Sequence, residues 1–223
     1  MAAPRTHIPE GADVPERHAD RVVAEMLQHI ARWQQARRSR PFLVRKAMSA
    51  GNPKAQERLV ERLRASGGIA AIDMKLTPGK RGRYMIEIHD WTVWDEARGV
   101  EMASGTAIPE KPWLLCCVTG VRGLGDGHTK VDSCYVLHLT HHCLSRLAQR
   151  CGARTVDDLI AATKALWGSY RAYRAVKPGT DTPDGTRLTV DLPNRMGKAV
   201  AVLRRHEDGG LIVATILDRA NGV

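Results

Sequence analysis

Residues 140–152 read THHCLSRLAQRCG, and here a strand-rich region gives way to helices. The stretch opens on a threonine, a good helix N-cap, and closes on a glycine, which suits the position just after a helix; we therefore predict a short helix. His142, Arg146 and Arg150 are four residues apart and share one face of that helix over about 12 Å. Three such groups in a row cost stability unless an anion lies opposite. The pattern favours a phosphate backbone as that anion.

Four runs ahead of this helix have strand character. In 83–94 apolar residues alternate with polar ones, and a Pro-Gly pair at 78–79 marks the turn before it. The glycine-rich loop 122–129 lacks the Gly-Lys-Ser/Thr ending and the following helix of a phosphate loop, so we interpret it as a hairpin turn. We predict strands at 69–76, 83–94, 113–121 and 130–139, forming an antiparallel β region over 67–139.

A second helix and three strands follow residue 152. Thr155 and Asp158 have the spacing of a capping box, and an apolar helical face comes after them. Three runs with strand character follow this helix, and they predict an antiparallel meander with a buried last strand: 186–192, 198–205 and 211–218. The predicted fold class is therefore α+β: an antiparallel sheet with helices packed on one face, preceded by a helical N-terminal segment.

The first 66 residues predict a basic helical segment. Apolar residues recur at helical spacing from Ala19, and Pro41 is expected to end this helix because it disfavours helix at Arg40. The predicted domains are 1–66, 67–139 and 140–223, with 67–223 as one domain left open. Cations near a helix C-terminus also complement its dipole, so a solvated face remains the alternative to nucleic-acid contacts. The predicted nucleic-acid-binding residues are Arg37, Arg38, Arg40, Arg45, Lys46, Arg154 and Arg187.

Composition agrees with an anionic partner. The 223 residues include 34 Lys and Arg against 24 Asp and Glu, a formal charge of +10. Such a balance favours RNA or DNA, or an acidic inhibitor or partner protein. No long apolar run or signal core is present, so we expect no membrane association and a cytoplasmic location. The five cysteines are odd in number and lie in apolar segments, which favours reduced thiols over disulfides.

The helix motif and the element order resemble a known superfamily. The region begins with a helix that carries His142-x-x-x-Arg146-x-x-x-Arg150. A second helix follows, and then a meander whose apolar last strand holds Thr215. This arrangement is similar to the ribonuclease toxins of the barnase, EndoU, colicin and RelE superfamily. The resemblance covers 140–223, about two fifths of the chain. It implies metal-independent RNA cleavage without a cofactor, in which a 2′-hydroxyl attacks its own phosphodiester.

The resemblance also implies roles for individual residues. His142 would be the general acid or base, because imidazole titrates near neutral pH. Arg146 and Arg150 would bind the phosphate and stabilise the charge of its transition state, and Thr215 would supply a hydroxyl contact. The sequence departs from the pattern in lacking a clear second His or Glu in the final strands, although His206 lies near the end of one.

Other interpretations of the same residues stay open. The arginines of the 140–152 helix can be simple surface residues above a packed apolar face. The basic helices can bind nucleic acid without cleaving it, or dock an acidic protein. A zinc site is a further alternative, because enough nitrogen and sulfur ligands lie close together in the sequence: Cys134, His138, His141, His142 and Cys143. However, no Cys-x-x-Cys pair is present.

Overall fold

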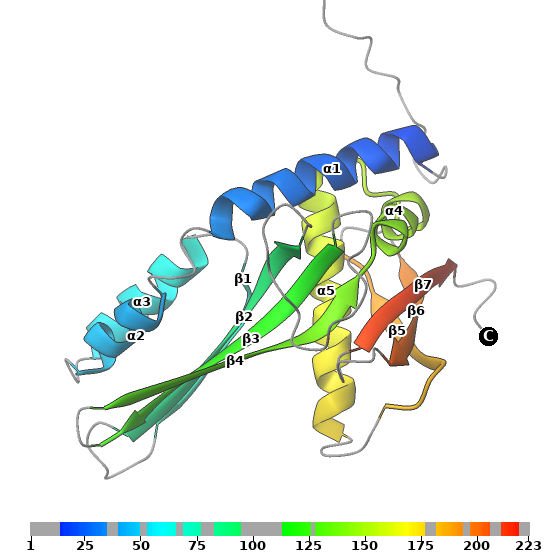
Figure 1. The fold of residues 1–223 in the computed structure, drawn as a ribbon. Helices are drawn as coiled ribbons and strands as arrows, with labels where there is room; N and C mark the ends of the chain where they lie inside the picture. The colour runs from blue at the N-terminus through cyan, green and yellow to red at the C-terminus, as the bar shows by residue number, and fades with distance from the viewer. Residues whose placement is uncertain are drawn as a thin grey trace, which may run out of the picture. The chain divides into compact units, whose positions relative to one another are not determined.

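The computed structural model describes residues 14–34, 40–49, 53–65, 69–76, 83–94, 113–125, 128–176, 182–193, 197–205 and 211–218. These stretches hold both helices and strands, so the fold class is α+β, as predicted (Figure 1). The helices are α1 (Glu16–Trp33), α2 (Arg40–Ser49), α3 (Pro53–Ala65), α4 (His141–Arg150) and α5 (Val156–Val176). The strands are β1 (Ile69–Leu76), β2 (Arg83–Trp94), β3 (Trp113–Leu124), β4 (Thr129–Leu139), β5 (Thr186–Asp191), β6 (Lys198–Arg205) and β7 (Leu211–Asp218).

Strand direction differs from the prediction in one respect. The pairs β1–β2, β2–β3 and β5–β6 are antiparallel, but the strands as a whole are mixed rather than purely antiparallel. The physical reason is the type of connection, since a tight turn returns the chain antiparallel whereas a helical connection can return it parallel. Helices α4 and α5 separate the strands of 69–139 from those of 186–218, so no tight turn sets the direction of the second group of strands against the first. The expectation of a purely antiparallel sheet was therefore too narrow.

The chain divides into two compact units. The first comprises residues 1–26, 139–205 and 212–223, and the second comprises residues 27–138 and 206–211. The division at 139 lies next to the boundary expected from the sequence at 140. Residues 27–66 belong to the second unit, where buried apolar residues of α2 and α3 pack with those of β2 and β3. The domain bounds expected from the sequence stay predictions.

In the second unit α2 and α3 cover one face of the strands, which follow the order β1-β2-β3-β4 (Figure 1). Alternate residues of β2 face these helices, as the period of two in the sequence predicts. A hydrogen bond of 3.1 Å from the Leu124 amide to the His128 carbonyl joins the end of β3 to the residue before β4. The core on the helix side contains Val44, Met48, Leu59, Leu63, Tyr84, Ile86, Ile88 and Val121.

Pro41 plays a different part from the one expected. The first helix already ends at Trp33, and Pro41 is the second residue of α2, which begins at Arg40. Proline is well tolerated in the first turn of a helix, because the amide it lacks would have no partner there. The prediction that Pro41 ends a helix was therefore wrong, and this proline helps to begin one.

In the first unit the strands follow the order β7-β6-β5, and α5 contacts β5. The amide of Asp158 donates to Thr155 Oγ1 at 3.2 Å, and the Asp158 carboxylate accepts from the Thr155 amide at 3.1 Å, so the predicted capping box starts α5. Leu188 and Val190 alternate with exposed residues along β5. None of the described helices is long and apolar enough to cross a membrane.

Candidate functional site

Helix α4 forms where the sequence predicts it. The hydroxyl of Thr140 accepts a hydrogen bond of 3.1 Å from the Cys143 amide, which is the N-cap contact expected for this residue. Gly152 has a φ of +64°, the left-handed conformation that favours glycine just after a helix. One face of α4 is packed into the unit by Cys143, Leu144, Ser145, Leu147 and Ala148.

The row His142, Arg146 and Arg150 lies on the other face of α4. His142 is exposed, and both arginines are partly buried. Arg146 Nη1 donates to Gln149 Oε1 at 3.1 Å, which holds that guanidinium along the helix surface. The helix thus brings together the three predicted site residues, and we call them the α4 row.

A chain of polar contacts lies beside the α4 row. Ser145 Oγ donates to Asp20 Oδ1 at 2.6 Å, and the same hydroxyl lies 3.5 Å from His141 Nδ1. Asp20 comes from α1, so a carboxylate of one helix reaches the imidazole of another through a serine. Sequence reasoning missed this arrangement because Asp20 and Ser145 are 125 residues apart. The signal it could have used is Ser145 itself, a polar residue on the apolar face of α4.

The remaining predicted residues of the first unit are dispersed over several elements. Arg154 is partly buried; its carbonyl pairs with His18 Nε2 at 3.0 Å, and its amide donates to Asp158 Oδ2 at 3.1 Å. Arg187 is exposed on β5, and Thr215 is partly buried on β7. These main-chain contacts of Arg154 fix the link between α4 and α5.

The residues predicted to bind nucleic acid in the N-terminal segment differ in their exposure. Arg45 and Lys46 are exposed on α2, as a surface contact requires, whereas Arg37 and Arg38 lie outside the described residues. Arg40 is only 3% exposed, and its Nη1 is paired with the carboxylate of Asp90. A buried guanidinium with a carboxylate partner is not presented to a phosphate, so the prediction for Arg40 was wrong.

The cysteine and histidine residues near 134–143 do not gather as zinc ligands. Burial raises the pKa of Cys143, and the charge of Cys151 raises it further, so the thiolate that zinc requires is disfavoured. Cys134 is exposed and His138 is fully buried. Within the described part of the chain, none of these side chains belongs to a group of three ligand atoms close enough to hold one ion.

A large aromatic side chain stacks on a base only where it is exposed. Trp91 is 4% exposed within the second unit, and it is therefore a core residue.

Comparison with known proteins gives no relative. No family model matches the chain, and neither a curated protein nor a solved structure matches it significantly.

Proposed function

We propose that the protein binds RNA through the α4 row and cleaves it without a metal ion. The observation that carries the proposal is the division of α4 into two faces. Its apolar residues are all buried in the unit, while His142, Arg146 and Arg150 follow one another a turn apart along the other face, His142 exposed and both arginines partly buried. This grouping of a proton-transfer residue with two phosphate-binding residues is what cleavage of a phosphodiester needs.

The chemistry assigns one task to each group. A base removes the proton of a 2′-hydroxyl, whose oxygen bonds to the adjacent phosphorus while the bond to the 5′-oxygen breaks. The leaving 5′-oxygen takes a proton from an acid, and a cyclic phosphate remains. His142 transfers one of these protons, and Arg146 and Arg150 stabilise the extra negative charge on the phosphate. Thr215 supplies a hydroxyl contact in this proposal.

The second proton-transfer group in this proposal is His141. It precedes His142 on α4, and its Nδ1 is connected to the Asp20 carboxylate through Ser145 Oγ. A carboxylate that reaches one ring nitrogen through a hydroxyl orients the ring. His206, the partner considered from the sequence, lies outside the described residues.

Cleavage assays test the proposal. Purified protein is incubated with mixed RNA in EDTA, beside His142→Ala, His141→Ala and, as a matched control, His128→Ala, which removes an exposed histidine of the other unit. We expect cleavage by the parent protein and by the control. We expect a decrease of roughly 100-fold or more in His142→Ala, the usual contribution of a general acid or base. Equal cleavage by all four proteins, or by none, rejects the assignment.

Binding without cleavage is the second candidate function. It is favoured by the exposed cations of the second unit, which lie on α2 and α3: Arg45, Lys46, Lys54, Arg58, Arg62 and Arg64. A basic surface of this kind attracts nucleic acid without supplying a proton-transfer group. Tight RNA binding with no cleavage by any of the proteins above would select this function.

The proposal also places the activity in the cytoplasm. All five cysteines are free thiols, and four of them are buried. Thiols that pack as small apolar side chains suit a reducing compartment.

A further inference from the structure

Asp73, Glu87 and His89 share one face of the β1–β2 pair in the second unit. Asp73 lies directly opposite Glu87 in the antiparallel register, and His89 follows Glu87 by two residues, which returns it to the same side of β2. The intervening Ile88 points to the other side, into the core beneath α2 and α3. We call these three residues the β1–β2 cluster.

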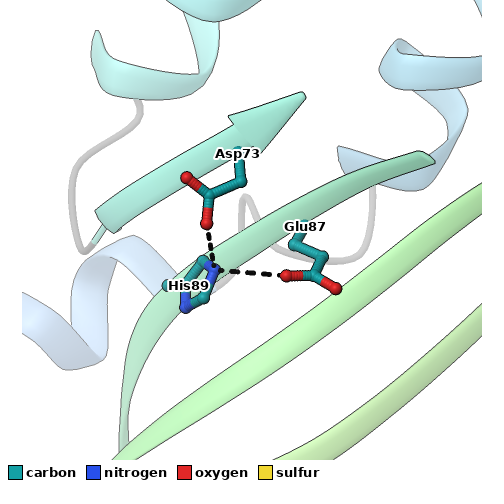
Figure 2. A group of neighbouring side chains, drawn as sticks. All are labelled: Asp73, Glu87 and His89. Atoms are coloured by element: carbon teal, nitrogen blue, oxygen red, sulfur yellow. Dashed lines mark ion pairs between the residues drawn. The ribbon is translucent and has the colours of Figure 1, made fainter. Parts of the chain in front are cut away.

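The side chains of the β1–β2 cluster converge. Figure 2 shows both carboxylates pointing toward the His89 ring, whose Nε2 is 3.2 Å from Asp73 Oδ2 and 3.9 Å from Glu87 Oε2. One ligand atom from each residue lies within 4.8 Å of the others. The His89 side chain is 6% exposed, whereas those of Asp73 and Glu87 are 36% and 37% exposed. The imidazole therefore lies at the buried side of the cluster, and the carboxylates lie at its solvent-accessible side.

A positive charge at this place is electrostatically favourable. Two carboxylates directly opposite each other on neighbouring strands repel and destabilise the pair. The His89 ring is more deeply buried than either carboxylate. A cation bound between the three ligand atoms would offset the repulsion between the carboxylates and would be coordinated by the ring nitrogen. The supporting strand is firmly anchored, because Ile86 and Ile88 are fully buried and the next residue on the same face of β2, Asp90, is paired with Arg40. Rigid support of this kind preserves ligand geometry.

We propose that Asp73, Glu87 and His89 form a binding site for a divalent transition-metal ion such as Zn²⁺. One imidazole nitrogen and two carboxylate oxygens suit zinc better than Mg²⁺ or Ca²⁺, which prefer oxygen ligands alone. Because the two carboxylates are partly exposed, water or another ligand can occupy the remaining coordination position. The site lies in the unit that does not contain α4, and it does not depend on the proposed RNA cleavage.

The test is a Zn²⁺ titration by calorimetry on full-length, tag-free protein stripped of metal with a chelator. The variants are Asp73→Asn and Glu87→Gln, which keep the shape of half-exposed side chains, and the matched control is Glu61→Gln, an exposed carboxylate on α3. We expect one saturable site per chain in the parent protein and the control. In the two cluster variants we expect weaker binding by roughly 10- to 100-fold or more, since removal of outer-shell partners alone costs that much.

Thermal unfolding supplies the second readout. Zn²⁺ should raise the melting temperature of the parent protein and of Glu61→Gln, because a ligand that binds only the folded state stabilises it. It should not raise that of Asp73→Asn, whose circular dichroism without metal reports whether the variant is folded. No saturable binding by the parent protein, or equal affinity in Asp73→Asn, would overturn the proposal.

Discussion

At the scale of single residues, the role of Arg40 depends on the side chains around it. In the sequence it belongs to a basic run and is indistinguishable from its neighbours. In the structure it pairs with Asp90, which lies 50 residues further along the chain. Composition reports the charge of Arg40 but not this partner, because the partner is fixed by the packing of α2 against β2.

The Arg40–Asp90 pair yields a stability prediction. Both side chains are at least 96% buried, so Asp90→Asn should leave a buried guanidinium without its counter-charge and lower the free energy of unfolding by about 3–5 kcal/mol. Urea unfolding measures this change. The exposed pair Lys198–Asp191 is the comparison, because Asp191→Asn should cost less than about 1 kcal/mol. Replacing both buried partners, as in Arg40→Met with Asp90→Leu, should cost less than Asp90→Asn alone; a larger cost contradicts this account.

Cys134 yields a prediction about pH. Partial burial raises the pKa of its thiol, and the negative charge of Glu87 raises it further. Only the thiolate reacts, so alkylation by iodoacetamide should require a higher pH than for an ordinary thiol. Glu87→Gln removes the second cause and should shift the curve of rate against pH to lower pH, as followed by mass spectrometry of the Cys134 peptide. Glu61→Gln should leave the curve in place, and an unshifted curve in Glu87→Gln would count against the interaction.

At the scale of elements, α4 could be predicted because its signals are local. The period of its apolar residues, the Thr140 cap and the glycine that follows it all lie within 13 residues of sequence, 140–152. The β1–β2 cluster could not be predicted in the same way. Alternation along β2 places Glu87 and His89 on one face, but the position of Asp73 opposite Glu87 depends on the register between two strands, which the alternation does not specify.

The N-cap of α4 can be tested directly. Thr140→Ala removes the acceptor of the Cys143 amide and should lower the free energy of unfolding by about 1 kcal/mol. Thr140→Ser keeps a hydroxyl and should retain most of that stability. Chemical denaturation of the three proteins measures the difference. If the alanine and serine variants are equally stable, the side-chain cap does not support the helix.

At the scale of the whole molecule, the sequence specifies how much positive charge the chain carries but not where it is accessible. The formal charge is +10, yet one of the candidate cations is buried, and others are divided between two units. Fold class and most element boundaries follow from periodicity and turn residues. The Ser145–Asp20 contact and the Arg40–Asp90 pair required the structure, because each joins residues far apart in the chain.

The salt dependence of RNA binding tests most directly whether the α4 row binds phosphate. A 2′-O-methyl oligonucleotide is used, because it lacks the attacking hydroxyl and stays intact. Arg146→Gln with Arg150→Gln should reduce the slope of log affinity against log salt by about 1.4, roughly 0.7 for each phosphate of a single strand that the variant no longer neutralises. The control, Lys164→Gln with Lys198→Gln, removes two exposed charges elsewhere and should leave the slope unchanged. Equal slopes in the two double variants would contradict the proposal that the α4 row binds RNA.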